Sequence, residues 1–159
     1  MSKFPENSKY RTLTEFKNRI LLLMDDNDCK SNKEFAELVG VSTPVISKAV
    51  NFAIVPTLRT LVRIADKLDL SIKYLLGLTE TNDFIGSATP TTFRERIKEL
   101  TDEENTNFGQ LVNNMYFPRT YIYEWQKENT YPSIDFVFEM SKHFNVSPDY
   151  LLGRTDYRK

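Results

Sequence analysis

The sequence is poor in the residues that small folds use for cross-links, metal ligands and phosphate-binding loops. Its 159 residues include one cysteine, Cys29, which excludes an intramolecular disulfide, and one histidine, His143. The five glycines form no phosphate-binding pattern, and no second ligand or nucleophile accompanies His143 or Cys29. We therefore expect no enzymatic activity, no metal and no cofactor.

Long apolar runs and a strong charge of one sign are also missing. No apolar stretch approaches the roughly 20 residues that cross a bilayer, and the N-terminus lacks the charged-then-apolar plan of a signal peptide. These features favour a cytoplasmic protein. The net charge is −1, with 12 basic and 10 acidic residues in 1–80 but nine and 12 in 81–159. Neither half is strongly basic, so contacts with nucleic acid would come from local patches.

The sequence does contain a repeat. Residues 68–77 return 76 residues later as residues 144–153, and the two copies, extended to Thr81 and Tyr157, share six of 14 positions. An echo at a fixed period indicates that one supersecondary unit is built twice. We expect a lead-in at 1–12, a first domain at 13–80, a linker at 81–91 and a second domain at 92–159.

Apolar spacing and capping residues predict five helices and no strand in the first half. Apolar residues recur at three- and four-residue intervals, most regularly between residues 58 and 68. Ser31 and Glu34 have the spacing of a capping box, and Pro44 fits the first turn of the third helix. The expected cap and turn residues are Thr14, Ser31, Gly40, Ser42, Thr57 and Ser71.

The second half repeats this plan. Thr92 and Glu95 have the spacing of another capping box, and apolar residues mark helices over about 93–100, 108–115, 118–127 and 134–144. In this alignment Ile122 stands at the position of Ile46 and Pro132 at that of Pro56. The fold class expected from both halves is all-α.

The first half resembles the lambda-repressor-like helix-turn-helix family of DNA-binding regulators, of the xenobiotic-response-element type. The matching residues are 35–42 (Phe-Ala-Glu-Leu-Val-Gly-Val-Ser), 46–47, 56–58 and 68–77. The tail of the second half, residues 146–153, is similar to the same family. Its helix-turn-helix region departs from the pattern, with Asn114, Tyr116 and Pro118 in place of Leu38, Gly40 and Ser42. The resemblance implies two tandem five-helix domains joined by a short linker, the second divergent.

In this family the third helix lies in the major groove, with its N-terminal residues nearest the base edges. The residues that the resemblance places at DNA in the first domain are Asn32, Ser42, Thr43, Pro44, Ser47, Lys48, Asn51, Thr57 and Arg59. The corresponding candidates in the second domain are Arg119, Thr120, Tyr121, Tyr123 and Lys127. Glu124 stands at the position of Lys48, and the DNA backbone would repel its carboxylate unless a cytosine amine donates to it.

The resemblance implies a sequence-specific regulator of double-stranded DNA, most simply a repressor of the phage or mobile-element type. The second domain would read a second half-site or serve as a dimerisation module. The rival interpretation is a protein-binding antirepressor or adaptor that does not bind DNA. It is favoured by the net charge, by the acidic second half and by the apolar loop at 52–55. We expect a homodimer or a protein partner to bind through that loop or through an aromatic surface of the second domain, because both are typical of protein interfaces. The aromatic residues are Tyr116, Phe117, Tyr121, Tyr123 and Tyr131.

Overall fold

The computed structural model describes residues 8–113 and 131–159. The chain divides into two compact units, with the boundary between Phe84 and Ile85. Regular structure in the described residues is helical and includes no strand, in agreement with the all-α prediction. An isolated β-bridge joins Thr12 and Ile54.

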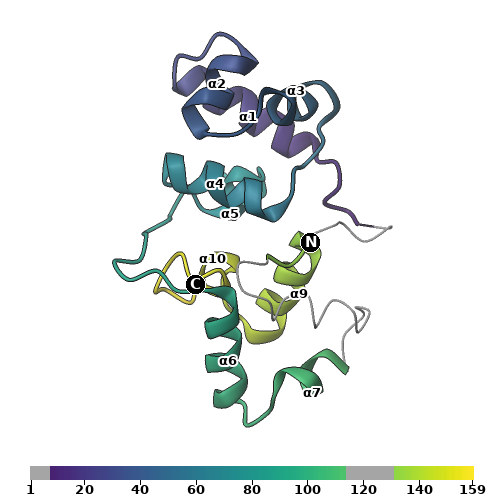
Figure 1. The fold of residues 1–159 in the computed structure, drawn as a ribbon, viewed down its shortest axis with the longest axis vertical. Coiled ribbons are helices and arrows are strands. Elements are labelled where there is room, and N and C mark those ends of the chain that lie inside the picture. The colour runs from purple at the N-terminus through teal and green to yellow at the C-terminus, as the bar shows by residue number, and fades with distance from the viewer. Residues whose placement is uncertain (1–7, 114–130) are drawn as a thin grey trace. The chain divides into compact units, whose positions relative to one another are not determined.

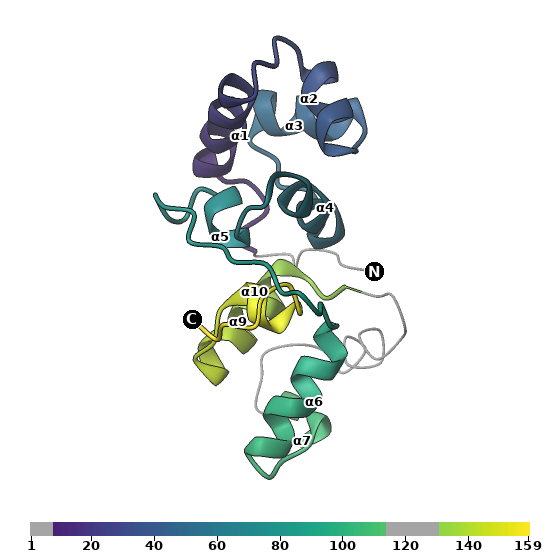
Figure 2. The ribbon, with the colours of Figure 1, turned by 90° about the vertical axis from the view of Figure 1, so that its left-hand side faces the viewer.

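The first unit contains five helices (Figures 1 and 2), and its core is made of their buried apolar side chains. They are α1 (Thr14–Asp26), α2 (Asn32–Val39), α3 (Thr43–Phe52), α4 (Leu58–Leu68) and α5 (Ile72–Leu75). Helix α3 packs against α1 and α2, while α4 packs against α2 and α5. The fully buried side chains include Phe16, Ile20, Phe35, Ile46, Leu58, Leu61, Ile64, Ile72, Leu75 and Leu76. Burial of these apolar side chains holds the helix-turn-helix rigidly on the rest of the unit.

The helix starts agree with the predicted N-cap residues Ser31, Ser42 and Thr57 but not with Thr14. The Ser31 hydroxyl accepts a hydrogen bond from the Glu34 N–H at 3.1 Å, while the Glu34 carboxylate accepts one from the N–H of Lys30. Thr14 is the first residue of α1, and Leu13 takes the N-cap position. Ser42 is the N-cap residue of α3, but its side chain makes no capping hydrogen bond.

The loop after α3 is less exposed than the sequence predicts, because the segment before α1 pairs with it. The Leu13 N–H donates to the Ala53 carbonyl and the Val55 N–H donates to the Arg11 carbonyl, both at 3.0 Å. Val55 is only 2% exposed, whereas Phe52 is 68% exposed. The predicted exposed apolar loop at 52–55 is therefore wrong for Val55 and is confirmed for Phe52.

The second unit contains the described helices α6 (Phe93–Glu103), α7 (Phe108–Asn113), α9 (Ile134–Phe144) and α10 (Pro148–Leu151). Helix α6 packs against α7 and α10, and α10 packs against α9. The rings of Phe93 and Phe136 meet edge to face, with their centroids 5.9 Å apart. Ile97, Val137 and Met140 are also buried, so this unit has an apolar core of its own.

Several local geometries of the first unit recur in the second at the spacing of the sequence repeat. The hydroxyls of Ser71 and Ser147 each accept a hydrogen bond at 3.0 Å from the N–H three residues later. Gly77 and Gly153 both adopt a left-handed conformation, with φ of 76° and 71°. The left-handed residues that end α4 and α9 are Asp69 and Asn145. The repeated segment therefore adopts the same backbone geometry in both units.

An arginine fastens the first helix of each unit to the end of its repeated segment. In the first unit the Arg19 guanidinium lies 3.9 Å from the ring centroid of Tyr74 and donates to the carbonyl of Thr79 at 2.8 Å. In the second unit Arg96 lies 4.1 Å from the Tyr150 ring centroid and donates to the Thr155 carbonyl. Stacking of a guanidinium on an aromatic face adds to the hydrogen bond. Sequence analysis missed this contact in both units.

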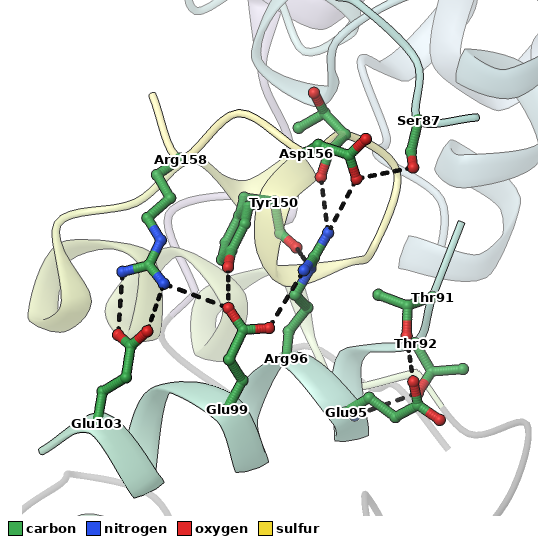
Figure 3. Close-up of polar contacts among 11 residues, drawn as sticks. Ser87, Thr91, Thr92, Glu95, Arg96, Glu99, Glu103, Tyr150, Asp156 and Arg158 are labelled. Carbon is green, nitrogen blue, oxygen red and sulfur yellow. Dashed lines mark hydrogen bonds and ion pairs between the residues drawn. The ribbon is translucent and has the colours of Figure 1, made fainter. Parts of the chain in front are cut away.

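Charged hydrogen bonds attach the C-terminal residues of the second unit to α6 (Figure 3). Arg158 donates to both carboxylate oxygens of Glu103, at 2.6 and 3.0 Å, and to Glu99 at 3.2 Å. The hydrogen bond from Arg158 holds the pKa of Glu103 below its ordinary value. Burial and the neighbouring Glu99 carboxylate, which accepts from the phenol, raise the pKa of Tyr150. Arg158 and Tyr150 thereby tie the C-terminal segment to the first helix of its unit.

Most of the expected linker makes hydrogen bonds to one unit or the other. Asn82 accepts from the N–H of Ser71 at 2.9 Å and donates to the carbonyl of Asp69 at 3.0 Å. From Ile85 onward the chain bonds to the second unit: the Thr155 hydroxyl donates to the Ile85 carbonyl, and the Ser87 N–H donates to the Arg154 carbonyl. The expected linker is therefore attached to the first unit at Asn82 and to the second unit from Ile85 onward.

Candidate nucleic-acid interface

The turn between α2 and α3 is set by Gly40 and by residues that satisfy its backbone groups. Gly40 has φ of 76°, and both its N–H and that of Val41 donate to the carbonyl of Ala36, at 2.9 and 3.0 Å. Arg63 of α4 donates to the Gly40 carbonyl at 3.4 Å. Two short helices joined by such a turn form a helix-turn-helix.

Helix α3 divides its side chains between the core and the surface as the 3.6-residue period requires. Ile46 and Ala49 point inward and are fully buried. The side chains on the opposite side are exposed and come from the residues that the sequence placed at DNA. They are Thr43, Pro44, Lys48 and Asn51, with Ser47 half-buried at the edge of this face.

A chain of hydrogen bonds links the start of α2 to the start of α3. The Asn32 side-chain amide donates to the Ser47 hydroxyl at 3.4 Å, and that hydroxyl donates to the Thr43 carbonyl at 3.2 Å. The sequence predicts that Asn32 and Ser47 lie on two successive helices, but it does not predict the hydrogen bond between their side chains. These bonds fix the first turn of α3 relative to the N-terminus of α2.

The electrostatics of this face depend on few charges. Lys48 is the only charged residue of α3, and it is exposed. It has no ion pair within the described part of the chain. Lys33 is also exposed, in the first turn of α2, where backbone N–H groups and the helix dipole favour an anion. Two exposed lysines and the α2 N-terminus can therefore donate hydrogen bonds to phosphate, while the Glu34 carboxylate in the same first turn of α2 opposes an anion there.

Thr57 and Arg59 lie at the beginning of α4. The Thr57 hydroxyl accepts from the Thr60 N–H at 3.5 Å, so it caps the helix. Arg59 is exposed two residues later. Ser42 is exposed before α3 and makes no capping bond. The structure therefore brings Asn32, Ser47 and Thr43 into one bonded group and places the remaining candidates of the first unit on its surface.

The second-domain candidates lie outside the described residues: Arg119, Thr120, Tyr121, Tyr123 and Lys127. The same holds for Tyr116, Phe117 and Glu124, whereas Tyr131 is described and half-buried. The expected aromatic surface and second reading helix therefore remain predictions.

Other chemistry finds little support in the residues that the structure describes. No group of three or more acidic, histidine or cysteine side chains there could hold a metal ion. His143 lies 3.3 Å from Glu104 in an exposed pair. Partial burial and the carboxylates of Glu34 and Asp28 raise the pKa of Cys29, which disfavours its reactive thiolate form. None of the helices in these residues is long and apolar enough to span a membrane.

Comparison with known proteins finds one match. A protein-family model described as Helix-turn-helix, of the lambda-repressor-like class, matches residues 30–75, which run from the residue before the α2 cap to the end of α5. No curated protein and no solved structure matches the chain. The match suggests a family of DNA-binding transcription regulators, whose members are typically not enzymes.

Proposed function

We propose that the protein is a sequence-specific regulator of transcription that places α3 in the major groove of double-stranded DNA. The observation that carries this proposal is the combination of the family match at residues 30–75 with the exposed outer face of α3. An α-helix fits the major groove, and the helix N-terminus is the part nearest the bases. Lys48 would donate to a guanine or a phosphate, and Asn32 and the α2 N-terminus would bind the backbone.

Repression is the simplest mode of action, because a protein bound across a promoter blocks access to it. A repressor of the phage or mobile-element type fits the resemblance of the first half. The second unit would be a second helix-turn-helix domain, which reads another half-site or mediates dimerisation. This assignment is supported by the recurrence of the serine cap, the left-handed glycine and the arginine–tyrosine stack. Tethering two reading domains would raise the effective concentration of each at the operator.

A second candidate function is a protein-binding antirepressor or adaptor. The observation that favours it is Phe52, an aromatic side chain that is 68% exposed at the end of α3. The net charge of −1 also favours it, since DNA-coating proteins are usually basic. In this alternative, Phe52 would insert into a partner protein and Lys48 would be a solvated surface charge.

Replacement of Lys48 by alanine separates the two functions. On a DNA operator, Lys48→Ala is expected to weaken binding roughly tenfold, or about 1–3 kcal/mol for a lost base contact. If Lys48 contacts phosphate, the slope of log affinity against log salt falls by about 0.9. The matched control is Lys73→Ala, which removes an exposed lysine from α5, a helix packed on α1 and α4.

The measurement is fluorescence anisotropy of a labelled duplex over a series of salt concentrations. The regulator proposal predicts a large effect of Lys48→Ala and little effect of Lys73→Ala. Equal effects of the two substitutions would mean that α3 is not the DNA-binding element.

A further inference from the structure

The first turn of α3 presents apolar atoms to the surface. Thr43 and Pro44 are both exposed, and Val45 beside them is half-buried. The core is filled by Ile46 and Ala49 of the same helix, so these exposed groups are not needed for packing. Pro44 has neither a backbone N–H nor a polar side-chain atom, so its exposed ring can make only apolar contacts.

Neither the Ser47 hydroxyl nor an arginine is free to donate to a guanine at this turn. The Ser47 hydroxyl already donates its proton to the Thr43 carbonyl, so it can act toward DNA only as an acceptor. No arginine occurs between Arg19 and Arg59, so α2 and α3 carry no guanidinium for a bidentate bond to guanine. Lys48, one turn further along α3, is the only cation of the helix.

The major groove offers one apolar group that matches this surface, the 5-methyl group of thymine. We propose that Thr43 and Pro44 recognise thymine methyl groups, so that the bound duplex carries thymines beneath the first turn of α3. This inference rests on the proposed function and adds the class of sequence that α3 reads. Cytosine lacks the methyl group, and the purines present polar atoms at the groove edge.

The hydrogen-bond chain from Asn32 through Ser47 to the Thr43 carbonyl supports this assignment. It holds the backbone of the first turn in place, so the Thr43 methyl and the Pro44 ring meet the groove in a fixed position. A fixed apolar contact excludes water from the thymine methyl on binding. Loss of one such methyl is expected to weaken binding roughly fourfold.

Uracil substitution tests this inference, because uracil differs from thymine only in lacking the 5-methyl group. A duplex is first selected from random sequence with the full chain, and each thymine in it is then replaced by uracil. At one or two positions we expect about fourfold weaker binding, with no change elsewhere. The Thr43→Ser variant, which lacks the side-chain methyl but keeps the hydroxyl, should lose this sensitivity at one position, and Thr43→Val should retain it. Pro44→Ala should lose it at the neighbouring position.

The possible results distinguish this inference from the function on which it rests. If a duplex is selected but binds equally well at every uracil position, thymine recognition is overturned while the regulator function stands. Thymine recognition is also overturned if uracil weakens binding by the same factor in the wild type, Thr43→Ser and Pro44→Ala. In that case the two residues have only a structural role, because their replacement does not change the effect of removing the thymine methyl. If no duplex is selected, the proposed function fails, and this inference fails with it.

Discussion

Gly77 and Gly40 offer a direct test of how the repeated segment is held, since they share a backbone conformation but differ in their surroundings. Both have φ of +76°. A Cβ atom at Gly40 would meet nothing closer than the Arg63 Cδ, at 3.9 Å. A Cβ atom at Gly77 would lie 2.6 Å from the carbonyl carbon of Glu15 and closer still to its oxygen. Both are backbone atoms of α1 and cannot move without shifting the helix.

Alanine substitution at each position therefore separates two costs. The left-handed conformation costs an L-residue about 1–2 kcal/mol, and this cost applies to Gly40→Ala and Gly77→Ala alike. Overpacking adds about 1–3 kcal/mol, and it applies only to Gly77→Ala. We therefore expect Gly40→Ala to lower the free energy of unfolding by about 1–2 kcal/mol and Gly77→Ala by about 2–5 kcal/mol.

Hydrogen exchange of the α1 and α4 amides measures the free energy of opening of the first unit separately from the second. The informative quantity is the difference in the free energy of opening between Gly40→Ala and Gly77→Ala. The cost of the left-handed conformation is the same in both variants and cancels in this difference. Equal destabilisation by the two substitutions would refute the close approach of the Gly77 backbone to α1.

Two further predictions follow from the caps and from the C-terminal ion pairs. Ser31→Ala should lower the stability of the first unit by about 1 kcal/mol, because it removes a capping bond. Ser42→Ala, which removes no such bond, should change it by less than about 0.5 kcal/mol in urea unfolding; the reverse order would contradict the assigned caps. Because Arg158 lowers the pKa of Glu103, their pairing stabilises the folded state above the ordinary carboxyl pKa and is lost as the pH falls through the lowered value. NMR titration of the Glu103 carboxyl should show a midpoint that rises in Arg158→Gln; an unchanged midpoint would count against the pairing.

Local patterns in the sequence predict the helices well, because each signal lies within one element. The apolar stripe of α4 is one example: Leu58, Leu61, Ile64 and Ala65 are all buried in the structure. The Ser31 cap and the Gly40 turn depend on residues three or four positions apart, and both are confirmed. Ser42 also stands at the predicted N-cap position, but the side-chain capping bond expected there is absent.

Contacts between distant residues could not be predicted from the same patterns. Arg19 reaches the Thr79 carbonyl across 60 positions, and periodicity only marks Arg19 as a residue beside the core. A signal was nevertheless available, since Tyr150 and Thr155 follow Tyr74 and Thr79 by 76 residues and Arg96 follows Arg19 by 77. Pairing of the lead-in with Val55 was missed for the same reason.

For the candidate interface, the sequence predicts which α3 residues are exposed but not how they are held. Thr43, Pro44, Lys48 and Asn51 are exposed because Ile46 and Ala49 occupy the inward positions of the same helix. The bond from Asn32 to Ser47 depends on the distance between two helices, which the turn at Gly40 and the packing of Arg63 determine together. The distance between α2 and α3 cannot be predicted from a local sequence pattern.

Selection of duplexes from a random pool by the full chain at low salt tests the central claim most directly. We predict that a defined duplex is enriched and that Lys48→Ala, but not Lys73→Ala, binds it roughly tenfold more weakly. The footprint length then distinguishes one reading domain per chain from two, because a second reader would protect a second half-site. If no duplex is enriched above background, the protein is not a sequence-specific DNA-binding regulator.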